Sequence, residues 1–231
     1  MEASFCRHLG AMVATPSSLL TKGERTRQRL KASLAELIEA QAYSGIRITD
    51  ICTAAGISQG AFYRYFLNRE AVTTEVLSDF DQFTRDVLYA TGRGYTDPYA
   101  AFYSTTEIYV AIFRSNPGLM RLLLLGNQEI PSGANILLRQ TNEWATRMSK
   151  ALLKRSPEPD EKQARFTAYA LGAMVDQTLS YLYIYRDPNV LNLVDTEAEI
   201  VRKLTDLQFR AAFGIEPAEA ATAKPERAKQ S

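Results

Sequence analysis

A short run of residues near position 60 combines side chains that suit contact with a nucleic acid. Gln59 carries an amide that can pair with the edge of adenine, and Tyr63 carries a hydroxyl suited to a phosphate oxygen. Arg64 carries a cation that suits either a base or the backbone. Gly60 and Ala61 have almost no side chain, so a helix bearing them can approach a groove closely, and Ala61 also suits a thymine methyl. The pattern indicates contact with double-stranded DNA.

Two short helices joined by a tight turn are expected to hold these residues. The first runs through residues 50–55 and ends at Gly56, because glycine takes a left-handed backbone without steric cost. Ser58 is a favourable N-cap for the second helix, expected over residues 59–66. One inner face is apolar and leaves the DNA-contacting residues outside; its members are Ile48, Ile51, Ala55, Ile57, Phe62 and Phe66.

This stretch resembles the TetR family of one-component transcriptional regulators. The resemblance extends from about Thr26 to Leu77. It rests on Asp50-Ile51, Ala55-Gly56-Ile57-Ser58, Gly60-Ala61-Phe62-Tyr63, Tyr65-Phe66 and Arg69-Glu70. It implies an all-α fold, in which an N-terminal three-helix helix-turn-helix DNA-binding domain joins a larger helical ligand-binding and dimerisation domain.

The resemblance also implies individual roles. Tyr63 and Arg69 match family residues that contact phosphates, and Tyr65 stands where the family often has histidine. Arg47 stands where the family usually has a capping Ser or Thr; an arginine does not supply that cap, but it reaches a phosphate. For Gln59 and Arg64, a solvated surface remains the alternative to base contact. The expected DNA-contacting set is Arg47, Thr49, Ser58, Gln59, Gly60, Ala61, Tyr63, Arg64, Tyr65 and Arg69.

Composition restricts the classes of function. The chain has 231 residues with 27 Lys and Arg against 26 Asp and Glu, so a DNA site must be a local basic patch. The basic segment from Lys22 to Lys31 supplies one and is expected to face the DNA backbone. The only histidine is His8, so the usual zinc and triad constellations are missing, and we expect no metal, no cofactor and no enzyme activity. Two cysteines and the lack of a long apolar run favour a cytoplasmic protein without a membrane span.

Four segments are expected along the chain. Met12 is an alternative start to Met1, which the sequence does not settle. The first helix of the DNA-binding domain is expected over residues 23–41, and Asn68 is expected to cap the helix that follows the motif. The segments are a flexible N-terminal arm (1–21), the DNA-binding domain (22–68), the ligand-binding and dimerisation domain (69–214) and a disordered tail (215–231).

The resemblance implies a small-molecule pocket in the second domain. Aromatic residues are spread over its helices, which favours a hydrophobic or aromatic effector. For any single residue, an ordinary core aromatic or a surface charge is the alternative. The expected lining is Phe80, Phe83, Tyr103, Glu107, Phe113, Trp144, Arg147, Tyr169 and Asp176.

The last two helices are expected to form the dimer interface, because in the family they pack against their symmetry mates as a four-helix bundle. The alternative is a purely intramolecular core. The expected interface residues are Ala170, Ala173, Gln177, Leu204, Leu207 and Ala211.

These observations predict a sequence-specific DNA-binding transcriptional regulator, a ligand-responsive repressor that acts as a homodimer on operator DNA. Two alternatives stay open. One is a helical small-molecule binder or enzyme with a vestigial DNA head, and the other is a DNA-binding protein that takes no ligand.

Overall fold

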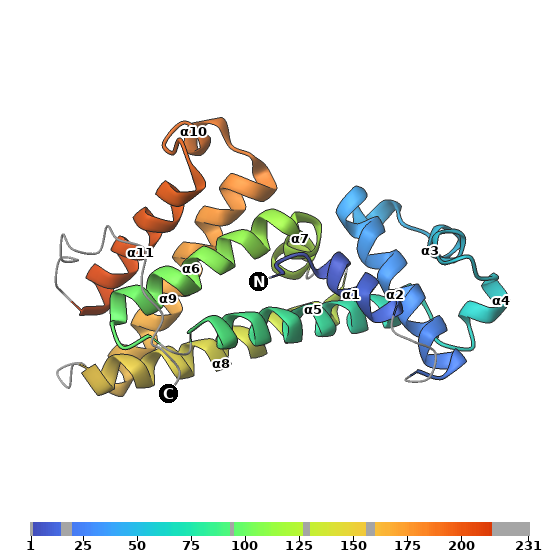
Figure 1. Cartoon of the computed structure of the whole chain (residues 1–231), viewed down its shortest axis with the longest axis horizontal. Coiled ribbons are helices and arrows are strands. Elements are labelled where there is room, and N and C mark those ends of the chain that lie inside the picture. The colour runs from blue at the N-terminus through green and yellow to red at the C-terminus, as the bar shows by residue number, and fades with distance from the viewer. Residues whose placement is uncertain (1, 15–19, 93–94, 127–129, 156–159, 214–231) are drawn as a thin grey trace. The chain divides into compact units, whose positions relative to one another are not determined.

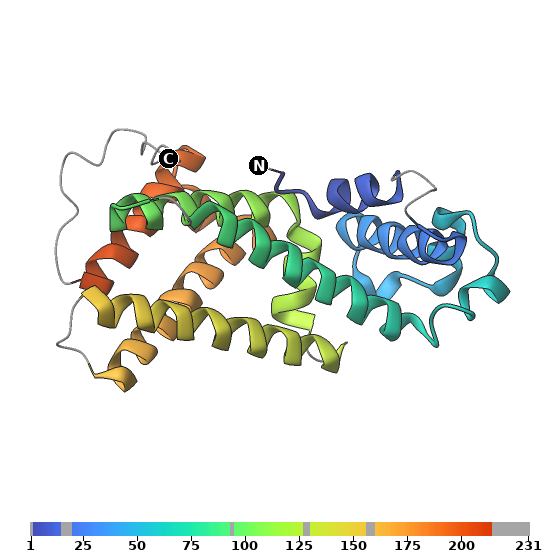
Figure 2. The ribbon, with the colours of Figure 1, turned by 60° about the horizontal axis from the view of Figure 1, so that its bottom comes forward.

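The computed structural model describes residues 2–14, 20–92, 95–126, 130–155 and 160–213 (Figures 1 and 2). Within these ranges every regular element is helical, which confirms the expected all-α fold. The chain divides into two compact units. Unit 1 comprises Met1–Thr84 and Ser115–Leu137, and unit 2 comprises Arg85–Arg114 and Leu138–Ser231. The predicted tail over residues 215–231 lies outside the described residues.

Unit 1 is built around α2, whose apolar stripe of Leu30, Leu34 and Ile38 is buried. α1, α3 and α7 all pack against α2. Its elements are α1 (Phe5–Val13), α2 (Lys22–Ala40), the 3₁₀ turn η1 (Tyr43–Gly45), α3 (Ile48–Ala55), α4 (Gln59–Phe62), α7 (Pro117–Leu125) and parts of α5 (Arg69–Gly92) and α8 (Pro131–Arg155).

α2 begins and ends within one residue of the expected 23–41. Its start is fixed by a capping box: the Glu24 N–H donates to Thr21 Oγ1 at 3.2 Å, and the Thr21 N–H donates to Glu24 Oε2 at 2.7 Å. The Thr21 hydroxyl also donates to Glu24 Oε2 at 2.7 Å, and this hydrogen bond, together with that from the Thr21 N–H, lowers the pKa of the Glu24 carboxyl.

α1 corrects the expectation of a flexible arm over residues 1–21, which is wrong for Phe5–Val13. Phe5 and Leu9 are each 1% exposed, and the Phe5 ring centroid lies 5.4 Å from that of Phe80. Asn116 holds the start of this helix: its Oδ1 accepts from the Phe5 N–H at 2.8 Å, and its Nδ2 donates to the Ala3 carbonyl at 2.7 Å. Ala3, Phe5 and Leu9 are therefore part of the core of unit 1.

Unit 2 packs α6 against α9 and α11. Tyr99 of α6 donates to Asp206 of α11 at 2.6 Å, and Thr106 donates to Gln208 at 2.9 Å. A Cβ placed on Gly172 of α9 would lie 3.0 Å from the Trp144 ring of α8, so this glycine allows close packing. Its elements are the rest of α5 and α8, α6 (Pro98–Ser115), α9 (Glu161–Leu179), the π-helical turn η3 (Ser180–Tyr185), α10 (Pro188–Leu191) and α11 (Glu197–Phe213).

No single helix in the described ranges is long and apolar enough to cross a bilayer, although α6 and α7 taken together pass the same test of length and composition.

Candidate nucleic-acid interface

The turn between α3 and α4 has the expected geometry. Gly56 has φ of 63°, in the left-handed region where glycine is favoured, and the Ile57 N–H donates to the Cys52 carbonyl at 2.9 Å. Ser58 Oγ accepts from the Ala61 N–H at 3.3 Å and so caps α4. The two helices and their turn are therefore fixed by local hydrogen bonds.

α4 is shorter than the helix expected over residues 59–66. It ends at Phe62, and the chain continues in turns in which the Tyr65 N–H donates to the Phe62 carbonyl at 2.8 Å. Phe62 and Phe66 are both buried, with ring centroids 5.8 Å apart. Anchoring these two rings in the core decides the path of this segment more strongly than helical propensity does.

The predicted DNA-contacting residues lie mostly on the surface of unit 1. Tyr63 is the clearest case, because a large aromatic side chain remains 57% exposed. Its ring packs edge to face with the Phe62 ring, at 5.4 Å between centroids. Ala61, Tyr65 and Arg69 are half-buried, whereas the exposed members are Arg47, Thr49, Ser58, Gln59, Gly60, Tyr63 and Arg64.

Arg47 stands at the N-cap of α3. Its N–H donates to Asp50 Oδ2 at 2.7 Å, which forms one half of a capping box. The other half needs a side-chain acceptor, which an arginine lacks. The exposed guanidinium is therefore not used in capping and is available to a phosphate.

Arg69 turns toward the protein instead. Its guanidinium donates to the Tyr43 carbonyl at 3.2 Å and to the Ile46 carbonyl, and it lies 4.3 Å from the centre of the Tyr43 ring. These contacts explain Arg69 by folding alone, and its phosphate contact stays a prediction.

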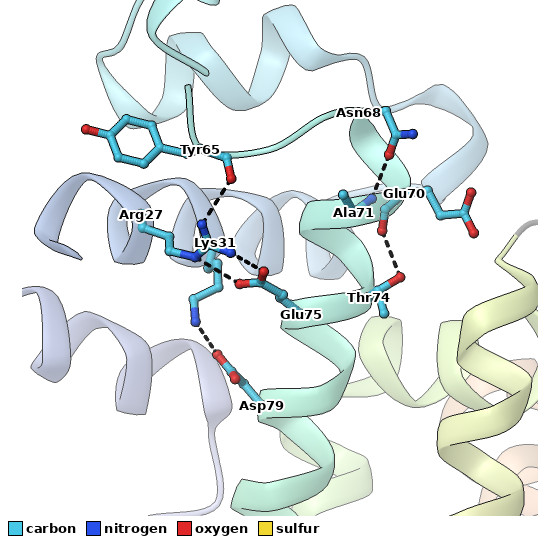
Figure 3. A network of polar contacts seen from close by, with 9 residues as sticks. All are labelled: Arg27, Lys31, Tyr65, Asn68, Glu70, Ala71, Thr74, Glu75 and Asp79. Carbon is cyan, nitrogen blue, oxygen red and sulfur yellow. Dashed lines mark hydrogen bonds and ion pairs between the residues drawn. The ribbon is translucent and has the colours of Figure 1, made fainter. Parts of the chain in front are cut away.

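Two ion pairs join α2 to the first half of α5 (Figure 3). Arg27 binds both carboxylate oxygens of Glu75, with 3.1 Å from Nε to Oε2. One turn along each helix, Lys31 Nζ lies 2.5 Å from Asp79 Oδ2. We call these four residues the α2–α5 ladder.

Arg27 also reaches the end of the DNA-contacting segment. Its Nη1 donates to the Tyr65 carbonyl at 3.0 Å, and its guanidinium lies 4.5 Å from the centre of the Phe66 ring. Asn68 Oδ1 accepts from the Ala71 N–H at 2.8 Å, which confirms Asn68 as the cap of α5 (Figure 3). The Arg27 side chain thus links both Tyr65 and α5 to α2.

The ladder corrects the expectation that the whole basic segment faces DNA. Arg27 and Lys31 pair with acids of α5, and Arg29 donates to the Ala55 carbonyl. Lys22 remains exposed. A signal was present in the sequence, since Glu75 and Asp79 are four residues apart, as are Arg27 and Lys31.

The model of the bacterial regulatory proteins of the tetR family matches residues 32–76, which contain most of α2, the α3–α4 motif and the start of α5. The chain belongs to the TetR family. It is therefore a DNA-binding transcriptional regulator, as expected from the motif.

The similarity of this TetR-family chain to other proteins covers most of its length. The HTH-type transcriptional regulator EthR of Mycolicibacterium smegmatis is 23% identical over 206 residues, which cover 84% of this chain and 89% of that protein. A transcriptional regulator from Rhodococcus sp. Rha1 has the same fold, with a TM-score of 0.68 and 21% identity over 83% of this chain and 99% of the other. The transcriptional regulator FadR of Bacillus subtilis, solved with stearoyl-CoA, gives a TM-score of 0.59 and 15% identity over 81% of this chain and 98% of the other.

The residues predicted to line a pocket belong to both units of this TetR-family chain. Phe80 and Phe83 belong to unit 1, where both pack against Phe5. In unit 2, Glu107 and Arg147 are exposed. Tyr169 is also exposed, and it donates to Asn142 at 3.2 Å. Tyr103 and Trp144 are half-buried, and Phe113 is fully buried.

Asp176 has the one marked electrostatic feature of this predicted set. Its Oδ1 accepts from the Tyr109 hydroxyl at 2.7 Å. Burial raises the pKa of Asp176 to about 6, and the hydrogen bond from Tyr109 opposes that rise only in part. Tyr109 is one of the aromatic residues that the sequence places on the helices of the second domain, but its contact with Asp176 was not predicted.

The residues predicted for the dimer interface lie at the surface of unit 2, with one exception. Ala170, Ala173, Gln177, Leu207 and Ala211 are exposed, whereas Leu204 is buried within the chain.

Proposed function

We propose that this TetR-family protein is a homodimeric repressor that reads a two-fold operator and releases it when a small molecule binds unit 2. The observation that carries the proposal is the exposed outer surface of the α3–α4 motif, above all Tyr63. Two such surfaces, one per subunit, would occupy successive major grooves, roughly 34 Å apart or a multiple of that distance.

The homodimer is supported by apolar surface on α9 and α11. Phe166 is 69% exposed and Leu207 is 49% exposed, and small residues lie between the large ones on α9. Exposed apolar patches of this kind mark interaction sites. Ala170 and Ala173 allow a partner helix to approach closely.

The DNA-binding domain is proposed to span residues 22–68 and the ligand-binding and dimerisation domain residues 69–214. α5, which begins at Arg69, would connect them. An effector can release DNA only by binding the non-DNA state more tightly than the DNA-bound state. FadR of Bacillus subtilis, solved with stearoyl-CoA, supports the idea that this fold takes a ligand with an apolar body.

Selection of bound duplexes from a random pool by the full-length protein tests the proposal. We expect enrichment of an inverted repeat whose half-site separation matches a two-fold dimer. Affinity for the selected duplex should fall steeply with salt concentration, because phosphate contacts release counterions. Recovery of no common sequence would overturn the operator-reading role and favour sequence-independent DNA binding.

A further inference from the structure

A partly buried carboxylate of unit 2 has no cation beside it. Asp176 of α9 accepts one hydrogen bond, from the Tyr109 hydroxyl of α6 at 2.7 Å. Among the residues that the structure describes, none forms an ion pair with it. A buried charge without a partner costs several kcal/mol in general, so such groups are uncommon outside sites that have a use for them.

The carboxylate keeps its charge at neutral pH. Burial raises the pKa of Asp176 to about 6, which leaves roughly nine-tenths of the molecules ionised at pH 7. Burial and the neighbouring Asp176 raise the pKa of Tyr109 well above its usual range, so the phenol remains the hydrogen-bond donor. Tyr109 therefore supplies a neutral dipole to Asp176 and no compensating charge.

Asp176 and Tyr109 are not fully enclosed by the rest of unit 2. Asp176 and Tyr109 are both half-buried, so each keeps accessible surface despite its depth in the unit. Beside them the fully buried Phe113 ring packs edge-on against Tyr109, with centroids 5.3 Å apart and an interplanar angle of 85°. On the side of α6, the carboxylate therefore meets an aromatic residue, Tyr109, which packs against a second one.

The backbone beside Asp176 is also irregular. α9 widens into the π-helical turn η3 within one turn of Asp176, and Ser180 Oγ donates to the Asp176 carbonyl at 2.7 Å. Widened turns of this kind are frequent at functional sites.

We propose that the effector is an amphiphilic cation, a protonated amine on an apolar or aromatic body, whose ammonium group binds Asp176. The ammonium would replace the missing partner of the carboxylate by a charge-assisted hydrogen bond. This inference rests on the proposed function, in which unit 2 binds an effector. It distinguishes this regulator from FadR of Bacillus subtilis, since the anionic stearoyl-CoA of that structure would bring like charge to Asp176.

Three probes with one hydrocarbon body test the charge of the ligand: phenylbutylamine, phenylbutanol and phenylbutyrate. Isothermal titration calorimetry of the full-length protein at pH 7 should give a dissociation constant at least about tenfold lower for the amine than for the alcohol. The carboxylate should bind most weakly. Absence of amine binding, or equal binding of amine and alcohol, would overturn the proposal.

Two variants locate the effect. Asp176→Asn preserves side-chain shape and an acceptor for Tyr109, so we expect it to abolish the amine preference and to leave the affinity for phenylbutanol unchanged. Unchanged alcohol binding also shows that the variant is folded. Glu161→Gln removes the same charge from the exposed first turn of α9 and should keep the preference. Persistence of the preference in Asp176→Asn would overturn the role of this carboxylate.

DNA binding is measured separately on the same preparations with the random duplex pool. If the protein selects a common duplex sequence from the pool but shows no preference for the amine, the inference fails and the proposed function stands. If it prefers the amine but retains no DNA, the proposed function fails instead.

Discussion

Tyr63 shows how a single residue can be assigned to DNA rather than to folding. Its hydroxyl has no hydrogen-bond partner among the described residues, and the ring is 57% exposed. We expect Tyr63→Phe to weaken binding to selected and random duplexes alike, by roughly three- to tenfold, because one phosphate hydrogen bond is lost. Fluorescence anisotropy on both duplexes measures this, with Tyr185→Phe as an exposed control in unit 2. Equal affinities of Tyr63→Phe and wild type would remove the assigned role.

Gln59 belongs to the same surface but should behave differently. It is exposed at the first position of α4, beside the small Gly60 and Ala61. We expect Gln59→Ala to change sequence preference at one position of each half-site by about 1–3 kcal/mol, with little effect on binding to random DNA. A repeat of the duplex selection with the variant measures this. Recovery of the wild-type consensus would instead place Gln59 in a solvated surface.

Asp176 makes a residue-scale prediction about stability that needs no ligand. Its folded pKa of about 6 lies above the value near 3.9 of an unfolded chain, so its proton stabilises the fold. That contribution is complete below about pH 4 and is lost as the pH rises through 6. We expect Asp176→Asn to raise the free energy of unfolding at pH 7, by on the order of 3 kcal/mol, and to change it little at pH 4. Urea denaturation at the two pH values measures this, and a difference that does not vary with pH would contradict it.

At the scale of elements, Arg27 makes more contacts in the α2–α5 ladder than its acidic partner Glu75 does. Within the ladder Glu75 pairs with Arg27 alone, whereas Arg27 also binds the Tyr65 carbonyl and covers the Phe66 ring. We expect Glu75→Gln to lower the free energy of unfolding by about 0.5–1 kcal/mol, as for a half-exposed ion pair. Arg27→Met should cost more, about 1–3 kcal/mol, because it also leaves a part-buried carbonyl without its donor.

Urea denaturation of both variants and of the double variant closes a cycle that isolates the ion pair. Lys203→Met removes an ion pair with Glu199 on α11 and a hydrogen bond to the exposed Leu193 carbonyl, and as the control it should have a smaller effect than Arg27→Met. Equal costs for Arg27→Met and Glu75→Gln would show that the contact with Tyr65 contributes nothing.

The elements that local sequence determines were predictable, and those that depend on distant partners were not. α2 has its cap in Thr21 and Glu24, and the α3–α4 turn has Gly56, so both could be placed from nearby residues. α1 offers only Phe5 and Leu9 as an apolar repeat, and the Asn116 that holds it is 111 residues away. The ladder likewise joins residues 48 apart in sequence. The same holds for the sites. The exposed residues of α4 could be predicted from the sequence, whereas the hydrogen bond between Tyr109 and Asp176, which joins two distant helices, could not.

At the scale of the whole molecule, dimer formation decides whether two α3–α4 motifs can bind one operator. A two-fold interface repeats every substitution on both sides, so one introduced charge is buried twice. We therefore expect Phe166→Glu and Leu207→Glu each to convert the protein to monomers at micromolar concentration, because both side chains now leave large apolar area exposed on α9 and α11. Sedimentation equilibrium measures the oligomeric state.

Leu138→Glu provides the matched control, since Leu138 is 67% exposed on α8, outside the predicted interface, and this variant should stay dimeric. The monomeric variants should keep the salt-dependent, sequence-independent part of DNA binding, because each subunit retains its own phosphate contacts. They should lose the advantage of the inverted repeat over a single half-site, because that advantage comes from linking two binding events in one molecule. Dimers that persist in both glutamate variants would move the interface away from α9 and α11, and a monomer that still prefers the inverted repeat would show that the subunits assemble on DNA.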